Sequence, residues 1–577
     1  MKNVKNLFGM AVMATALVGC SSNDNLNPNA NDGAGKTGEA YAKFTIQLPT
    51  TNGTRAEGDP SFNGGTANEY AVKDAQLVIF QKSGASEGDY KFVETVNIGN
   101  LEPWTDNTPN TGVTRYANIT AQLKGVSLDK TGNEYFALVI LNNGSESKVT
   151  LPTTKGTTYS EWNVATNAKG SAAFLNSDNG FYMANAPLYS TGEPATLVSI
   201  KGVYSTKAEA QKNPATTVYV ERGMAKVTIG STTFDANKAV EASANYNGDK
   251  VTITNWTLDV LNKSTFPVHA TTGLTTNFAN IWATPRFVAT GSTPQRVYWG
   301  IDPNYNKTTL TTVEECQKDF YIVDNNRNTY NGDASLTFAW SDHSTPLYCL
   351  ENTFDLDNMK QGQTTRVVFK ATYTPHALAS AADKTFFMIG NNTQIWTKDA
   401  LVEQITSKAK EMLNSTDVVV TINTDAPLLK GGSHLLSSAD VTIMDGTDDK
   451  TAAFDFATLN TKLGLNNTEK DVNNNPTVGI KTYKNGECYY IARIKHFNEL
   501  TPWASGQLYG TDNASFLGRY GVLRNNWYDL TVSKVSAPGY PDVPVVNPNT
   551  PDDEDTKYIN VEVKILDWAK RSQSVDL

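Results

Sequence analysis

Cys20 is the first residue of this chain whose type and setting indicate a covalent chemistry, the acylation of its thiol. It ends the stretch Leu17-Val18-Gly19-Cys20, which closes a short apolar run, Leu7–Gly19, behind a basic start. The run has the length of a signal-peptide core and is too short to span a bilayer. A small residue before a cysteine at this place is the bacterial lipoprotein signal, so we expect removal of residues 1–19 and attachment of lipid, palmitate included, at Cys20. The alternative is an ordinary signal peptide that happens to end at a cysteine.

Arg55 indicates a second chemical event, cleavage of the backbone by a protease. The stretch from Thr50 to Gly65 consists largely of Thr, Asn, Gly, Asp and Pro, which indicates a surface loop, and Arg55-Ala56 lies near its middle. An arginine in such a loop is readily cut by an Arg-specific protease. One cut between Arg55 and Ala56 would separate the lipid and the segment 20–55 from the rest of the chain.

Few other residues could carry chemistry. The histidines show no HExxH or other paired spacing, and neither a GxSxG motif nor a phosphate-binding Gly-rich loop occurs. Cys316, Cys349 and Cys488 have no CxxC spacing, which favours buried thiols over a zinc site; one disulfide is possible, but the sequence does not choose the pair. Asp355-Leu356-Asp357-Asn358 has the residue types of a calcium loop without the glycine and closing glutamate of an EF-hand. We expect no catalytic residue, metal or cofactor, and an unknown hydrolase is the least favoured function.

Composition and patterning predict an all-β protein. With 577 residues the chain is long enough for at least two domains, and its formal net charge of −10, without a basic cluster, argues against nucleic acid as a partner. A single amphipathic helix, Asp399 to Leu413, is predicted to pack across a sheet. We expect two β-sandwiches with long insertions and a boundary near Pro214. Alternating segments predict strands at Ala75–Phe80, Tyr135–Leu141, Val218–Ile229, Val251–Val260, Thr365–Tyr373, Val418–Ile422 and Cys488–Ile494.

The two ends of the chain carry the same strand pattern next to polar linkers. Residues 21–38 and 540–557 are rich in Asn, Gly, Asp or Pro, which is typical of solvated linkers. Near the start, residues 41–48 alternate and place four apolar residues on one face: Ala42, Phe44, Ile46 and Leu48. Near the end, residues 558–565 alternate in the same way and place on one face Ile559, Val561, Val563 and Ile565.

Two interpretations of these paired patterns stay open. Each strand can pair within its own domain, or both can fit one groove, the N-terminal strand before cleavage and the C-terminal strand of another molecule afterwards. The second arrangement is β-strand addition, in which main-chain hydrogen bonds supply affinity and alternate side chains fill pockets. Burial of four such side chains contributes up to ~6–12 kcal/mol by transfer free energies, as an upper bound. A sandwich that lacked the strand would expose a hydrophobic cleft and an unpaired edge.

Motifs in a fixed order along the chain resemble a known family. They begin with the lipoprotein signal, residues 41–49 and Thr54-Arg55-Ala56-Glu57-Gly58-Asp59, continue with 220–227 and 348–353, and end with 520–528, 561–568 and Val575-Asp576-Leu577. The set is similar to the major subunit of the short (minor) fimbriae, the Mfa type, within the type V pilins, or fimbrillins, of Bacteroidales. No single motif is sufficient, and the order of the whole set carries the resemblance.

The resemblance implies a shaft subunit that is exported as a lipoprotein, cut after Arg55 and polymerised head to tail by donor-strand exchange, with a role in adhesion and virulence. It implies two transthyretin-like β-sandwich domains. The expected divisions are a signal peptide (1–19), a propeptide (20–55), two sandwiches (56–214 and 215–539), a linker (540–557) and a C-terminal donor strand (558–577). Expected partners are other copies of the chain, accessory anchor and tip subunits, an Arg-specific protease, host or bacterial surface receptors, and the outer membrane while the precursor is lipidated. The alternative function is a monomeric surface lipoprotein that binds glycan or peptide.

Overall fold

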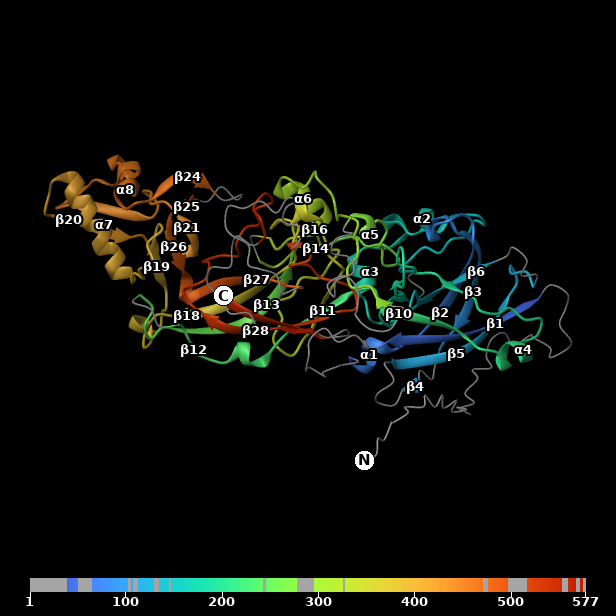
Figure 1. The fold of residues 1–577 in the computed structure, drawn as a ribbon. Helices are drawn as coiled ribbons and strands as arrows, with labels where there is room; N and C mark the ends of the chain where they lie inside the picture. Colours follow the sequence, from blue (N-terminus) through green and yellow to red (C-terminus); the bar gives the residue numbers. More distant parts are fainter. Residues whose placement is uncertain are drawn as a thin grey trace, which may run out of the picture.

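The computed structural model describes residues 39–49, 65–101, 105–106, 113–128, 134–144, 147–241, 245–277, 295–324, 327–470, 476–496, 516–552, 559–566 and 571–573. The described chain is mostly β-sheet with few helices, as the all-β prediction requires, and the finer assignment to transthyretin-like domains stays a prediction. Figure 1 shows three parts in a row: an N-terminal part with β1, a central part with β11 and β28, and an insert with α7 at the far end. No helix in the described ranges is long and apolar enough to cross a membrane.

The N-terminal part is built on one nine-stranded sheet. Its strands lie in the order β3-β2-β6-β7-β10-β1-β5-β4, with β9 beside β6. Side chains from both halves of this sheet share one apolar core, so the sheet curls around that core. The helices of this part are α1 (Ala67–Tyr70), α2 (Tyr159–Trp162), α3 (Ser171–Leu175) and α4 (Lys207–Lys212). The strands are β1 (Ala40–Pro49), β2 (Ala75–Gln81), β3 (Lys91–Gly99), β4 (Thr105–Asp106), β5 (Val113–Leu123), β6 (Tyr135–Leu141), β7 (Met183–Asn185), β9 (Val198–Ser199) and β10 (Thr216–Arg222).

The prediction of one strand over Val218–Ile229 is wrong, because two strands occupy this stretch. β10 ends at Arg222 and β11 (Ala225–Ile229) follows, since the chain leaves the N-terminal sheet here and enters a second sheet. A side chain at Gly223 would place its Cβ 2.8 Å from the ring of Tyr182, so a glycine is needed where the two sheets meet closely. The N-terminal sheet therefore reaches beyond the boundary expected near Pro214.

The central part is a β-sandwich of two sheets, one in the order β17-β11-β28-β29-β30 and the other β12-β13-β18-β27. Buried side chains of both sheets form one apolar core. Two short pairs lie beside it, β14 (Leu261–Asn262) with β16 (Phe320–Tyr321) and β15 (Gln295–Arg296) with β8 (Leu188–Tyr189), together with α5 (Leu274–Asn277) and α6 (Val313–Asp319). The sandwich strands are β12 (Lys238–Ala239), β13 (Lys250–Asp259), β17 (Leu347–Cys349), β18 (Arg366–Thr374), β27 (Glu487–Arg493), β28 (Trp527–Val535), β29 (Ile559–Leu566) and β30 (Arg571–Gln573).

The insert between β18 and β27 has an apolar core of its own. The predicted helix is confirmed as α7 (Lys398–Leu413), which begins where the Thr397 hydroxyl accepts a hydrogen bond from the N–H of Ala400 and ends at Asn414 in the left-handed conformation. Its other elements are β19 (Phe386–Ile389), β20 (Val418–Ile422), β21 (Gly432–His434), β22 (Val441–Asp445), β23 (Asp448–Asp449), α8 (Phe456–Lys462), β24 (Asn466–Lys470), β25 (Pro476–Val478) and β26 (Ile480–Tyr483). The predicted strands at 75–80, 135–141, 251–260, 365–373, 418–422 and 488–494 are confirmed to within one residue.

The expectation of a solvated linker is wrong for residues 540–552, which we call the strap. Tyr540 exchanges two backbone hydrogen bonds with Tyr489, at 2.7 and 2.8 Å. Val546 is buried in a small apolar cluster, and Asp552 is buried where its carboxylate accepts a hydrogen bond from the Thr364 hydroxyl at 3.2 Å. The prolines keep the strap extended, but the sandwich supplies hydrogen-bond partners that a free linker would take from water.

Replacement of Glu87 by Gln will remove a pH dependence from the stability of the N-terminal part. One carboxylate oxygen of Glu87 accepts hydrogen bonds from the N–H groups of Thr196 and Leu197, at 2.8 and 2.6 Å. Burial raises the pKa of this carboxyl from 4.5 to about 7, although these bonds lower it. Stability from this group is therefore present below pH 4.5 and is lost as the pH rises toward 7. Thermal unfolding of both proteins from pH 4 to 8 will show a slope in the wild type that Glu87→Gln lacks; parallel curves contradict the assignment.

Candidate functional site: the strand slot and the junction

β1 occupies an internal position of the N-terminal sheet, which we call the strand slot. It pairs antiparallel with β5 along its whole length and parallel with β10, where Phe44 lies opposite Thr216 and Ile46 opposite Val218. The apolar residues at alternate positions, Ala42, Phe44, Ile46 and Leu48, are at most 1% exposed and belong to the core of the curled sheet. Without β1, this sheet would have two open edges and a gap in its core.

Polar groups hold the outer side of β1 in a fixed register. Tyr41 exchanges backbone hydrogen bonds with Tyr204, at 2.8 and 2.9 Å. The Lys43 ammonium donates to a backbone carbonyl of α4 at 3.1 Å, and the Thr45 hydroxyl donates to the Asn118 side chain at 2.7 Å. A shift of β1 by one residue would break these contacts and turn its apolar face to water.

The C-terminal strand lies within its own chain. β29 pairs antiparallel with β28 along its length, and β30 covers β29 only opposite Val563, Lys564 and Ile565. The register sets four apolar positions of β29 opposite buried residues of β28: Ile559 opposite Val535, Val561 opposite Val532, Val563 opposite Leu530, and Ile565 opposite Tyr528. In this state of the chain, each end strand thus pairs within its own part.

The residues predicted for processing lie outside the described part of the chain. These are the lipidation residue Cys20 and the cleavage residues Arg55 and Ala56. Lipid attachment and cleavage therefore stay predictions from the sequence.

Three of the sequence motifs meet where β10 passes into β11, and we call this meeting point the junction. The N–H of Asn525 donates to the carbonyl of Met224 at 2.7 Å, and the N–H of Lys226 donates to the carbonyl of Asn526 at 2.9 Å. On the same side, Asn352 and Val522 exchange two backbone hydrogen bonds, at 2.7 and 2.9 Å. The motifs 220–227, 348–353 and 520–528 are thus parts of one contact between the N-terminal and central parts.

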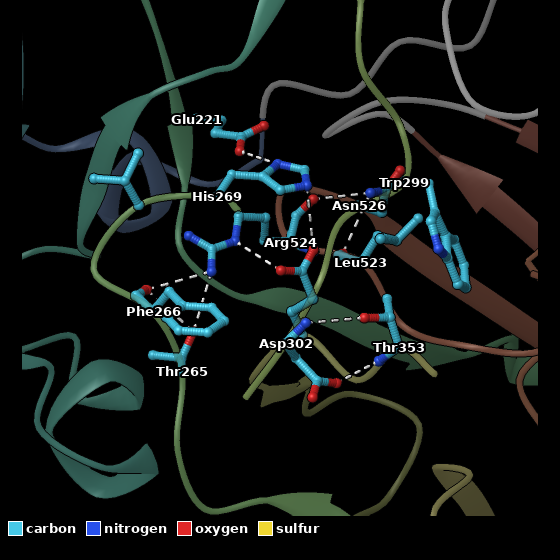
Figure 2. A network of polar contacts seen from close by, with 12 residues as sticks. Glu221, Thr265, Phe266, His269, Trp299, Asp302, Thr353, Leu523, Arg524 and Asn526 are labelled. Carbon is cyan, nitrogen blue, oxygen red and sulfur yellow. Dashed lines mark hydrogen bonds and ion pairs between the residues drawn. The ribbon is translucent and has the colours of Figure 1, made fainter. Parts of the chain in front are cut away.

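A cluster of buried charges lies at the junction (Figure 2). Glu221 on β10 binds Nδ1 of His269 at 2.7 Å, and Nε2 of His269 lies 3.7 Å from Glu351. Glu351 also binds the Arg524 guanidinium, with 3.2 Å between Oε2 and Nε. These four side chains are at most 3% exposed. A Cβ on Gly300 would come 2.1 Å from Nε2 of His269, so only glycine leaves room for the imidazole.

A second buried ion pair links α1, which precedes β2, to the junction. The carboxylate of Glu69 on α1 lies 2.6 Å from the Lys226 ammonium and accepts a hydrogen bond from the Tyr348 hydroxyl at 2.6 Å. Burial alone would raise the pKa of Glu69, but the hydrogen bonds from Lys226 and Tyr348 hold it below its ordinary value. The Lys226 ammonium also lies 3.7 Å from the ring centroid of Trp527, a cation–π contact. Glu69 is therefore a carboxylate that joins both parts at neutral pH.

Asp302 extends the polar network on the side of the central part (Figure 2). Its carboxylate accepts hydrogen bonds from the N–H groups of Thr353 and Asn304, both at 2.6 Å, and from the Asn262 amide at 2.9 Å. Burial raises the pKa of Asp302 to about 7 against the effect of these bonds. These bonds join the segment after β17, which contains Thr353, to Asn262 on β14, so Asp302 braces the loops beside the cluster.

The other candidate groups have structural roles where they are described. Cys316, Cys349 and Cys488 are free and buried, and burial raises the pKa of each thiol to about 12, which leaves the thiolate scarce. Asp355 accepts hydrogen bonds from the N–H groups of Asp357 and Asn358, both at 3.1 Å, and so caps a short helical turn. Within the described ranges no set of three or more His, Cys, Asp or Glu side chains is placed to hold a metal ion.

The sequence alone did not identify Glu69, Glu221, His269, Glu351 and Arg524 as members of one contact. Three of the five, Glu221, Glu351 and Arg524, lie in motifs that carry the family resemblance, but these motifs are far apart in the sequence. The charged residues within these motifs were the signal that could have pointed to a shared contact.

Residues 481–574 match the family described as major fimbrial subunit protein type IV, fimbrillin, C-terminal. No curated protein matches the chain. A proposed cell adhesion protein from Parabacteroides distasonis is 12% identical, with 92% of this chain and 98% of that chain covered and a TM-score of 0.36. The tip fimbrial protein Mfa3 from Porphyromonas gingivalis, with a C-terminal truncation, is 10% identical, with 92% and 100% covered and a TM-score of 0.28. Scores this low do not establish a shared fold.

The family match covers β27, β28, β29 and β30, and with them the strap, part of the junction and the C-terminal strand. Residues 481–574 are therefore similar to the C-terminal region of the fimbrillins, and this match supports the resemblance drawn from the ordered motifs.

Proposed function

We propose that this chain is the repeating shaft subunit of a cell-surface fimbria and polymerises head to tail by donor-strand exchange. In this proposal the precursor is anchored to the outer membrane by lipid at Cys20, and cleavage after Arg55 frees the mature chain, 56–577. β1 then leaves the strand slot, and the C-terminal strand of another copy replaces it. The subunit works as a structural polymer that supports adhesion, without catalysis.

The observation that carries the proposal is the position of β1. A strand that lies inside a sheet, with both edges paired and its apolar face fully buried, is joined to the rest of its own part only through residues 50–64. A cut at Arg55 would sever the covalent connection between β1 and the rest of the N-terminal part, while β1 stays connected to the proposed anchor at Cys20. Loss of β1 would leave a slot that a strand with the same alternation can fill.

The C-terminal strand has the features of such a replacement. β29 offers apolar residues at four alternate positions, as β1 does, and among the described residues one of its two sides pairs with β30 over three residues. The strap is bound to the central part up to Asp552, so the chain before β29 keeps its attachment when β29 detaches. A strand in the slot has one long neighbour, β5, and one short neighbour, β10, much as β29 has β28 and β30.

The proposed partners follow from this assembly. They are other copies of the chain, an anchor subunit at the cell end and a tip subunit at the other, an Arg-specific protease that cuts the precursor, and receptors on host or bacterial surfaces. The precursor would reside in the outer membrane and the mature chain in the fimbrium.

Arg55→Ala is expected to leave the chain lipidated and unpolymerised, because β1 stays connected and keeps the slot filled. The measurement is N-terminal sequencing of surface fibres together with gel electrophoresis of unboiled samples, which shows a ladder only for a strand-exchanged polymer. Wild-type fibre subunits should begin at Ala56. Fibre subunits that begin at Cys20 would falsify cleavage as the trigger.

Cys20→Ala is expected to block delivery to the outer surface and hence fibre formation, since the lipid is the proposed route of export. Immunogold labelling of intact cells with the variant will measure surface protein. Normal fibres from this variant would show that any signal peptide suffices and that lipid attachment is dispensable.

A cleft favours the alternative function, a monomeric lipoprotein that binds glycan or peptide. It lies between the sandwich and the insert and has a volume of about 420 Å³. Its lining combines apolar residues such as Leu378 and Ile395 with polar side chains that include Asn245, Asn247, His376 and Gln394. Such groups suit a ligand rich in hydroxyl or amide groups. Protease-treated protein that gives no ladder in unboiled gels but retains a glycan or peptide would favour this second function.

A further inference from the structure

β10 belongs to two structures at once. Its first half, Thr216–Tyr219, pairs with β1 and forms one wall of the strand slot. Its second half, Val220–Arg222, pairs with β7 and runs into the junction. Val218 and Val220 are buried in the same core as the apolar residues of β1. A displacement at one end of this seven-residue strand therefore moves the other.

The junction end of β10 is anchored by Glu221 and Arg222, which are at most 3% exposed. Glu221 binds His269 at 2.7 Å, as Figure 2 shows. The Arg222 Nε donates to the backbone carbonyl of Glu69 at 2.7 Å, and its Nη1 and backbone N–H both donate to the Asn525 side chain at 3.3 Å. These partners come from α1 and from the central part, so β10 is held by groups outside its own sheet.

The slot end of β10 has little support on the side away from β1. On that side the Ala186 N–H donates to the Tyr219 carbonyl at 2.9 Å, and the Lys201 N–H donates to the Thr216 hydroxyl at 2.9 Å. The spacing between β10 and β5 must match the width of one strand, which a sheet sets at about 4.8 Å on each side. The fixed end of β10 is the feature that can maintain this spacing.

We infer that Glu221 and Arg222 are positioning residues of the strand slot, which hold β10 from the junction so that a strand can bind between β10 and β5. The inference concerns the folded chain with β1 in place and does not depend on polymerisation. It also implies the reverse effect, because coupling between two sites is reciprocal: a poorly seated β1 loosens the junction.

The test is hydrogen exchange of the full chain, read as the ratio of exchange rates in β1 to those in β2. Both strands contribute to one core, so a general loss of stability would raise both rates together. Glu221→Ala should raise the exchange of β1 by about tenfold or more and leave β2 within about twofold. Glu221→Gln keeps an acceptor for His269 and should restore most of the wild-type ratio.

The reverse effect has a matched pair of variants. Ile46 in β1 and Ile79 in β2 are both 0% exposed in the same core, but only Ile46 lies opposite β10. Ile46→Ala should accelerate exchange of the junction amides of Lys226 and Asn525, and Ile79→Ala should not.

The inference is overturned if Glu221→Ala leaves β1 unchanged, if β1 and β2 accelerate equally, or if Ile46→Ala and Ile79→Ala affect the junction alike. If Glu221→Ala does not fold, Arg222→Lys serves instead, because it keeps the charge and loses the forked contact to Glu69 and Asn525. The ratio of exchange rates in β1 and β2 is measured on the monomeric chain. Its outcome is therefore independent of fibre formation, which is measured separately by unboiled gels.

Discussion

A chain truncated after Asp555 will fold, will end a fibre and will not extend one. The truncation keeps the strap, whose Val546 and Asp552 are buried against the central part, and it leaves β1 in the slot. It removes β29, the strand proposed to enter the slot of the next subunit. Electron microscopy of cells and ladders in unboiled gels will measure fibre length, and we expect loss of all polymer beyond the shortest species.

Two single substitutions test the same step without a change of length. Val563→Asp would place a carboxylate among the apolar groups of the slot, where burial of an unpaired charge costs several kcal/mol. A slip by one residue gives no relief, because it turns the whole apolar face outward. Glu562→Gln, on the opposite face of the sequence pattern, is the control and should polymerise normally. If the truncated chain or Val563→Asp forms fibres of normal length, the C-terminal strand is not the donor and the monomeric binder gains support.

Arg524→Met will destabilise the chain by about 3–5 kcal/mol, because it leaves Glu351 charged, buried and without its cation. Glu351 is 0% exposed and Arg524 is 2% exposed, and the same guanidinium donates to the Thr265 hydroxyl at 3.1 Å. Urea unfolding followed by tryptophan fluorescence will measure the change, since Trp299 and Trp527 lie near the junction.

The matched control is a salt bridge on the surface. Lys82 and Glu134 lie 2.6 Å apart but are 46% and 58% exposed, so Lys82→Met should cost at most about 1 kcal/mol. Equal effects of Arg524→Met and Lys82→Met would show that the buried cluster contributes no more than a surface pair and that the junction is held by apolar packing.

The strands that the sequence predicted well show two kinds of pattern. β2, β6 and β27 are buried over nearly their whole length, and a short apolar run is the signal that such a strand leaves in the sequence. Residues 41–48 and the second half of β18 instead alternate between buried and partly exposed positions, which period-two patterning detects. The prediction failed at Gly223, because a strand that passes from one sheet to another keeps its alternation while it changes neighbours.

The strap and the junction could not be predicted from local pattern. Proline-rich composition indicates that the strap is extended. It does not say whether the strap is solvated or bound to the sandwich, because that depends on hydrogen-bond partners far away in the sequence, such as the backbone of Tyr489. The junction depends on pairs such as Arg222 and Asn525, which are 303 residues apart in the sequence. The partner of each buried charge is determined only when both sheets are assembled. Periodicity in the sequence therefore cannot predict these ion pairs.

The long pairing of β1 with β5 also determines how the slot responds to force. The hydrogen bonds to an antiparallel neighbour lie perpendicular to the strand, so a pull along the axis of β1 shears all ten of its pairings with β5 at the same time. A pull across the sheet would instead open the pairings one after another, from one end. A strand in this slot is therefore hard to extract along its own direction and easy to peel sideways, so it can enter or leave stepwise from one end.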